Sequence, residues 1–151
     1  MKTLSGYAEW FWLMAKNIKP VENRDWSLFK YIKREQLPLR IYLHASKTKA
    51  SKDEIDFIRR HLTTGQLQVF DSVNWKEYRG AIIGEITITG QVTLVESGIL
   101  ADDEGLQAVY SGWFFGIYGF VVKDGKLYDK PIPYKGQLGF FSVELPIGIN
   151  R

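Results

Sequence analysis

The sequence predicts a mainly β domain with flanking helices, an α+β fold built around a small β-barrel. Three observations support this prediction: several short strand-like segments, only two segments with helical spacing, and glycine-rich corners between them. The chain has 151 residues, enough for one domain with a real core and too few for two ordinary domains. We therefore expect residues 1–151 to form a single domain.

The first predicted helix covers residues 7–17, where Trp10, Leu13 and Met14 follow the three-to-four-residue spacing of one buried face. Pro20 is expected to end this helix. The following residues 19–26 are predicted to be extended or turning, because a residue before proline disfavours the helical region.

The next two elements are a strand and a helix. Leu39–Ala45 alternates and is rich in strand-forming residues, which predicts a strand. Ser51 and Glu54 have the spacing of a capping box, which predicts a helix from there to about Leu62. Gly65 then has the position of a helix stop.

The second half of the chain is predicted to be mostly strand. Residues 80–95 alternate in polarity and form the clearest strand region. The acidic, glycine-containing residues 96–110 are interpreted as a surface loop. Residues 116–122 form a further strand, followed at residues 123–126 by an Asp-Gly pair typical of a two-residue hairpin turn.

Two segments complete the predicted sheet. Residues 127–134 contain Pro131 and Pro133, which restrict them to a sheet edge or a bent crossing. Residues 138–145 are predicted to form the last strand.

Several classes of protein are excluded or disfavoured by composition. The chain has no cysteine, which excludes disulfides, thiolate zinc sites and cysteine nucleophiles. Its two histidines lack a paired carboxylate pattern, so we expect no metal site, and nothing indicates a cofactor. The N-terminal residues lack the continuous apolar region of a signal peptide, and no stretch approaches about 20 apolar residues. We therefore expect a cytoplasmic protein that does not bind a membrane.

Charge and aromatic content leave two interpretations open. Residues 1–79 contain 15 Lys and Arg against 9 Asp and Glu, whereas residues 80–151 contain 5 against 8. The basic first half either attracts phosphate groups or is a solvated surface whose excess of positive charge arose by chance. Aromatic residues are 15% of the chain, and they either fill the core or stack on bases.

Several segments, in order along the chain, resemble the ASCH family of PUA-like domains. They span most of the chain, from about Gly6 to Leu145, and the segment from Lys19 to Arg24 is the most specific of them. The matching pieces are residues 17–24 with Trp26, Leu39–Ala45, residues 81–86, Trp113, Tyr118 with Gly119, and residues 136–139.

The resemblance implies a PUA-like small β-barrel of the ASCH type, with a basic cleft beside the first helix. The family is described as RNA-associated, and some members resemble small ribonucleases. A compact subgroup resembles amidohydrolases that act on N4-acylated cytidine with a Lys, a Thr or Ser, and a Glu. Lys19 matches the Lys of that set, but Glu22 stands where the subgroup has Thr or Ser.

Lys19 and Glu22 are the candidate catalytic residues. A partly desolvated lysine can act as a base or nucleophile, or it can remain charged and bind phosphate. The alternative is a structural lysine at a helix C-terminus. Glu22 and Arg24 share one parity of an extended segment, so they are expected to line one surface, either as ligand contacts or as a structural ion pair.

The remaining candidate residues are proposed to bind a ligand. The aromatic candidates can stack on a base, and Trp26 is the first choice. His44 is alternatively a structural residue, and Lys47 is alternatively an ordinary solvated lysine. These candidates are Asn23, Arg24, Trp26, His44, Lys47, Trp113 and Tyr118.

Three functions follow from these residues. The preferred one is binding of RNA or a modified nucleoside. The alternatives are a metal-independent hydrolase, acting on N4-acylcytidine or RNA, and a protein-interaction domain.

Overall fold

The computed structural model describes residues 1–146. In this part of the chain, the strands are β1 (Lys2–Gly6), β2 (Val21–Arg24), β3 (Leu39–Ala45), β4 (Ala81–Val95), β5 (Gly98–Leu100), β6 (Tyr118–Pro133) and β7 (Phe140–Ser142). The α-helices are α1 (Ala8–Ala15), α2 (Lys52–His61), α3 (Thr64–Ser72) and α4 (Asp103–Tyr110). Short 3-10 helices lie at Leu28–Lys30, Arg34–Gln36 and Trp75–Glu77.

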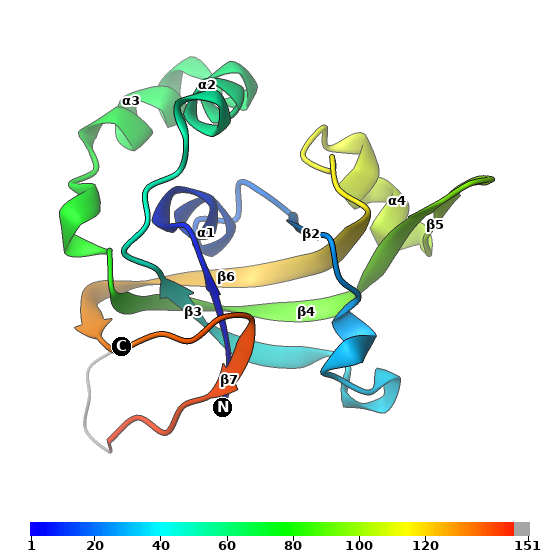
Figure 1. The fold of residues 1–151 in the computed structure, drawn as a ribbon. Coiled ribbons are helices and arrows are strands. Elements are labelled where there is room, and N and C mark those ends of the chain that lie inside the picture. Colours follow the sequence, from blue (N-terminus) through cyan, green and yellow to red (C-terminus); the bar gives the residue numbers. More distant parts are fainter. Residues whose placement is uncertain (147–151) are drawn as a thin grey trace.

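All the strands belong to one mixed sheet with the order β2-β6-β4-β3-β1-β7, and β5 pairs with the end of β4 (Figure 1). The pairing of β1 with β3 is parallel, and the other pairs are antiparallel. The predicted α+β class is confirmed. Within residues 1–146 the sheet is curved but does not close, since no backbone pairing joins β2 to β7. Strand β1, which was not predicted, lies beside the last strand.

Helix α1 lies inside the curve of the sheet and forms the centre of the core (Figure 1). All eight of its residues are buried, not only the predicted face of Trp10, Leu13 and Met14. A helix surrounded by apolar partners is buried on every side. A second, smaller cluster containing Tyr42, Tyr128 and Phe141 packs separately from this core.

Helix α1 ends at Ala15, before the proline predicted to end it, because Asn17 adopts a positive φ of 60°. The backbone N–H groups of Ile18 and Lys19 both donate to the carbonyl of Leu13. These bonds satisfy the carbonyl end of the helix in the manner of a left-handed cap. The turn delivers Lys19 directly beneath the helix.

The predicted hairpin at residues 123–126 is wrong. Strand β6 continues through these residues and stays paired with β4 on both sides of them. Three steps along β6, from Lys123 to Lys126, face two steps along β4, from Thr87 to Glu85, so one extra residue forms a bulge. Asp124 has a φ of 53°, and the same positive-φ tolerance that suits a hairpin turn also suits a bulge.

Two further predictions are wrong because capping residues were overlooked. Residues 96–110 contain β5 and helix α4 rather than a loop, and the side chain of Asp102 caps α4 by accepting from the N–H of Gly105. Gly65 does not stop a helix but lies in the first turn of α3, which Thr63 caps. Both caps are ordinary N-terminal signals.

The other predicted elements are confirmed, most of them with changed boundaries. Strand β3 has the predicted bounds, and α2 begins with the predicted capping box of Ser51 and Glu54. The proline-containing residues 127–133 belong to β6, and in the described residues only β4 pairs with them. The last strand, β7, has three residues rather than the eight predicted.

Candidate functional site

A buried ion triad lies where α1 meets β2. The Nζ of Lys19 donates to Oε1 of Glu22 at 3.3 Å and to the carbonyl of Val21 at 2.5 Å. The Nε and Nη2 of Arg24 donate to Oε2 of Glu22 at 3.2 and 2.8 Å. Lys19 is 2% exposed and Glu22 6% exposed, so Glu22 is a buried carboxylate shared by two cations.

Burial and charge act in opposite directions on the triad. Burial lowers the pKa of Lys19, and the neighbouring Glu22 carboxylate opposes this shift only in part. Burial also acts to raise the pKa of Glu22, but the charges and hydrogen bonds of Arg24 and Lys19 outweigh it and hold that pKa below its usual value. Glu22 is therefore ionised at neutral pH.

The local fold explains how the three side chains meet. The turn at Asn17 and Pro20 brings Lys19 to the start of β2, which pairs with β6. Glu22 and Arg24 are two residues apart on that strand, so both side chains point to the same face, as the sequence predicted.

A cleft of about 680 Å³ opens above this triad. One wall comes from the end of β1, the start of α1, and β2 with the residues after it. The other comes from the residues after β3, the first turn of α2, the loop between α4 and β6, and the loop between β6 and β7. The lining residues are Ser5, Gly6, Tyr7, Trp10, Lys19, Glu22, Asn23, Arg24, Asp25, Trp26, Ser46, Thr48, Glu54, Phe115, Leu138 and Gly139.

The charges that line the cleft do not make it basic. Lys19 and Arg24 are the two cations, and three acidic residues stand against them: Glu22, Asp25 and Glu54. The cluster of lysines at residues 47, 49 and 52 is exposed, and none of these three residues lines the cleft. The predicted excess of positive charge therefore lies outside the cleft.

Four aromatic residues line the cleft: Tyr7, Trp10, Trp26 and Phe115. The Nζ of Lys19 lies 5.0 Å from the ring centroid of Trp10, and the guanidinium carbon of Arg24 lies 5.4 Å from that of Trp26. Both tryptophans therefore contact a cation of the triad.

The structure brings together five of the nine candidate residues. Lys19, Glu22, Asn23, Arg24 and Trp26 all line the cleft. The Asn23 side chain also has a structural task, because it bonds to the backbone of residues 113, 115 and 116. It holds the loop that carries Phe115.

The other four candidates do not line the cleft. His44 is buried and bonds to Ser5 and to the carbonyl of Tyr134. Lys47 is exposed and its aliphatic stem lies over Gly80. Trp113 is buried against Trp10, Phe57 and His61, and Tyr118 lies on β6 opposite Arg24.

Sequence reasoning missed most of the far wall of the cleft. Ser46, Thr48 and Glu54 follow β3, and Leu138 and Gly139 precede β7. Only the structure distinguishes Ser46, because its buried hydroxyl has no hydrogen-bond partner among the described residues. No local pattern in the sequence marks these positions.

No group of three or more His, Asp or Glu side chains is placed to hold a metal ion within residues 1–146. None of the helices described is long and apolar enough to cross a membrane.

Comparison with known proteins identifies several similar solved structures. No protein-family model matches the chain, and no curated protein matches it. Solved structures that are similar include the ASCH protein from Zymomonas mobilis, with 15% identity and a TM-score of 0.49 over 95% of this chain and 87% of that one. Two mutants of that protein give 12% identity with a TM-score of 0.49, and 13% with 0.47.

The mutant structures align with 95% of this chain, and with 89% and 87% of their own chains. These solved structures are of ASCH proteins, the family that the sequence resembles.

Proposed function

We propose that the cleft binds a nucleoside, either free or as an unpaired base exposed on RNA. The observation that carries this proposal is the combination of four aromatic side chains with the buried Lys19–Glu22–Arg24 triad in one cleft. Aromatic faces stack on any base, and fixed polar groups read its edge.

The size of the cleft suits a ligand of this class. Its volume of about 680 Å³ lies within the range of ordinary small-molecule sites. The triad also retains hydrogen-bonding capacity for a ligand, because Nη1 of Arg24 has no partner among the described residues. The carboxylates of Asp25 and Glu54 add acceptors for an amino group on the ligand.

The charge of the cleft favours a neutral ligand over a polyanion. Three carboxylates against two cations give no net attraction for phosphate. An RNA would then be held mainly through one base in the cleft, with backbone contacts restricted to the exposed lysines around α2. A free nucleoside needs no such contacts.

The test is a calorimetric titration of the protein with a panel of nucleosides that includes cytidine and N4-acetylcytidine. Trp26→Leu should weaken the best ligand by roughly fivefold or more, since base stacking contributes about 1–3 kcal/mol. Trp75→Leu is the matched control, because Trp75 packs on Trp12 and Phe70 away from the cleft. Affinity for the nucleoside should also be nearly independent of salt.

The proposal fails if no nucleoside binds, or if both tryptophan variants weaken binding equally. Binding that is strong only for RNA and steeply salt-dependent would instead favour a phosphate-binding surface, because counterion release gives that dependence.

A hydrolase is the second candidate, and the position of Lys19 favours it. A neutral amine has two N–H groups and one lone pair. The two acceptors around Nζ, the Val21 carbonyl and Glu22, match the two N–H groups and leave the lone pair for a proton. Burial moves the pKa of Lys19 in the direction that this role requires.

For an N4-acylated cytidine, Lys19 would accept a proton from the attacking water and pass it to the departing amine. Products would be cytidine and the carboxylic acid. Lys19→Met should lower turnover by about 10²–10⁴-fold, and Lys16→Met, on an exposed lysine, should not change it. If the Lys19 variant keeps its turnover while remaining folded, Lys19 has no catalytic role.

A further inference from the structure

Residues 134–139, here named the strap, connect β6 to β7 and end at the mouth of the cleft. Leu138 on the strap is 99% exposed and lines the cleft, as does Phe115, which is 56% exposed. A single exposed leucine needs no explanation. Two exposed apolar side chains from distant segments that line the same cleft are more informative, because a ligand between them would remove both from water.

His44 holds one end of the strap. Its Nε2 lies 2.7 Å from the carbonyl oxygen of Tyr134, and its Nδ1 lies 3.1 Å from Oγ of Ser5. A carbonyl oxygen can only accept, so Nε2 carries the proton and Nδ1 of the neutral ring accepts from the Ser5 hydroxyl. Both ring nitrogens are thus used inside the protein, and the ring is 2% exposed.

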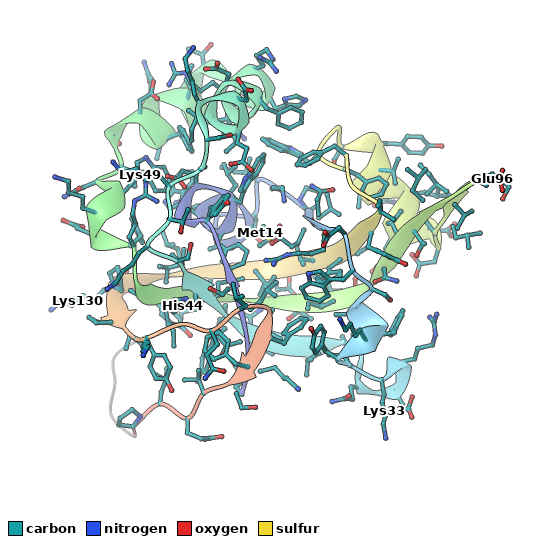
Figure 2. The ribbon with its side chains drawn as sticks, in the orientation of Figure 1. Met14, Lys33, His44, Lys49, Glu96 and Lys130 are labelled. Atoms are coloured by element: carbon teal, nitrogen blue, oxygen red, sulfur yellow. The ribbon has the colours of Figure 1, made fainter. Side chains whose placement is uncertain are left out.

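Strands β1 and β3, which carry Ser5 and His44, also hold the rest of the strap. The backbone N–H of Ser5 donates to the carbonyl of Gly139 at 3.2 Å. Gly136 lies directly on the His44 ring, since a Cβ at position 136 would approach Cε1 of His44 to 2.2 Å. Figure 2 shows His44 beside the strap, on the opposite side of β3 from α1.

We propose that Leu138 contacts the ligand in the cleft and that His44 is the positioning residue that places Leu138 there through the strap. This inference rests on the nucleoside-binding function proposed above. It gives His44 an indirect role, because the ring is fully occupied by Ser5 and Tyr134 and does not line the cleft.

The first experiment measures nucleoside affinity in Leu138→Ala. Half-burial of the leucine by a ligand contributes about 0.75–1.5 kcal/mol, so its removal should weaken affinity by about four- to twelvefold. Leu100→Ala is the matched control, because Leu100 is also an exposed leucine but lies on β5 and does not line the cleft. Equal effects of the two substitutions would overturn the role of Leu138.

The second experiment tests, without any ligand, whether the hydrogen bond from His44 to the Tyr134 carbonyl holds the strap in place. Amide hydrogen exchange in residues 135–139 should become faster in His44→Leu, which has no donor for the Tyr134 carbonyl. His44→Gln should restore slow exchange, because its amide N–H can reach the position of Nε2. Unchanged exchange in His44→Leu would overturn the positioning role.

If His44→Leu fails to fold, Gly136→Ala replaces it, since that substitution pushes the strap away and keeps the histidine. The same exchange experiment is then read on Gly136→Ala.

A double-mutant cycle joins the two halves of the proposal. If His44 acts through Leu138, then His44→Leu should weaken nucleoside binding in the natural sequence but have little further effect in Leu138→Ala. Additive losses would overturn the link. If no nucleoside binds the natural protein, the role of Leu138 falls together with the proposed function, while the exchange result still decides the tie at His44.

Discussion

The single carboxylate of Glu22 is the shared counter-ion of both cations of the triad. Oε1 accepts from Lys19 and Oε2 accepts from Arg24, so each oxygen has a different partner. A buried ion pair is a weak source of stability in itself, but removal of one member leaves a buried charge without compensation. Loss of the shared carboxylate is therefore expected to reduce stability more than loss of either cation alone.

Glu22→Gln should lower the free energy of unfolding at pH 7 by about 3–5 kcal/mol, because the buried Lys19 and the half-buried Arg24 would both lose their counter-ion. Urea denaturation followed by tryptophan fluorescence measures this loss. A loss below about 1 kcal/mol would mean that the cations find other partners.

The same substitution has a predicted pH dependence. The pKa of Glu22 is lower in the folded protein than its usual value of 4.5, so its contribution to stability is present above that pH. As the pH falls below about 4.5, the carboxylate is protonated first in the unfolded chain, and the contribution of Glu22 to stability decreases. The difference in stability between the natural protein and Glu22→Gln should therefore narrow between pH 5 and pH 3. A constant difference across that range would contradict the assignment.

At the scale of the elements, the bulge in β6 packs against the end of α1. The side-chain amide of Asn17 donates to the carbonyl of Gly125 at 3.0 Å, and its oxygen accepts from the N–H of Gly125 at 2.7 Å. This pair of bonds joins the left-handed end of the helix to the bulge. It thereby supports the turn that delivers Lys19.

Gly125→Ala should destabilise the protein, because a Cβ there would lie 2.3 Å from the carbonyl oxygen of Met14 and 2.8 Å from that of Ala15. Both neighbours are backbone atoms of α1 and cannot move without shifting the helix. We expect a loss of about 1–3 kcal/mol, the usual cost of overpacking. Thermal denaturation measures it.

Gly65→Ala is the matched control for that substitution. Nothing lies within 4 Å of a Cβ at position 65, which is in the first turn of α3. Alanine favours a helix over glycine, so this variant should be unchanged or more stable by up to about 1 kcal/mol. If both variants lose stability equally, close packing at Gly125 is not the cause.

At the scale of the whole molecule, Arg24 spans the open part of the sheet. Its Nη2 donates to Glu22 on β2 and to the carbonyl of Ser5 on β1, at 2.8 Å in each case. Strand β2 is at one end of the strand order and β1 is next to the other end, and no backbone pairing joins the two within residues 1–146. One guanidinium therefore provides a connection that the backbone does not.

Arg24→Lys should weaken this connection although the charge is kept, because an ammonium lacks the planar fork that reaches both acceptors. The expected loss is about 1.5–3 kcal/mol, the range for a hydrogen bond to a charged group, with faster amide exchange in β2. Arg60→Lys, on an exposed arginine of α2, is the control and should change neither quantity. Unchanged exchange in β2 would contradict the connecting role.

The sequence predicted the elements whose signals are local. The alternation in Leu39–Ala45 and the capping box at Ser51 are contained within a few residues, and both were placed correctly. The Asp-Gly pair shows the limit of such signals, because positive φ suits both a hairpin turn and a bulge. Only the long pairing of β6 with β4 decides between them.

By itself, the sequence determined the α+β class, two of the four α-helices in residues 1–146, the longer strands, and the half of the cleft formed by residues 19–26, because these depend on contacts between near neighbours in the chain. The tertiary structure alone decided the other half. Ser46, Glu54, Phe115 and Leu138 reach the triad only through strand order and loop paths. The same is true of the charge balance, because the basic residues of the first half separate into an exposed cluster and two cations, Lys19 and Arg24, that share the cleft with three carboxylates. Proximity between segments far apart in the chain arises from packing of the whole sheet, and no local pattern encodes it.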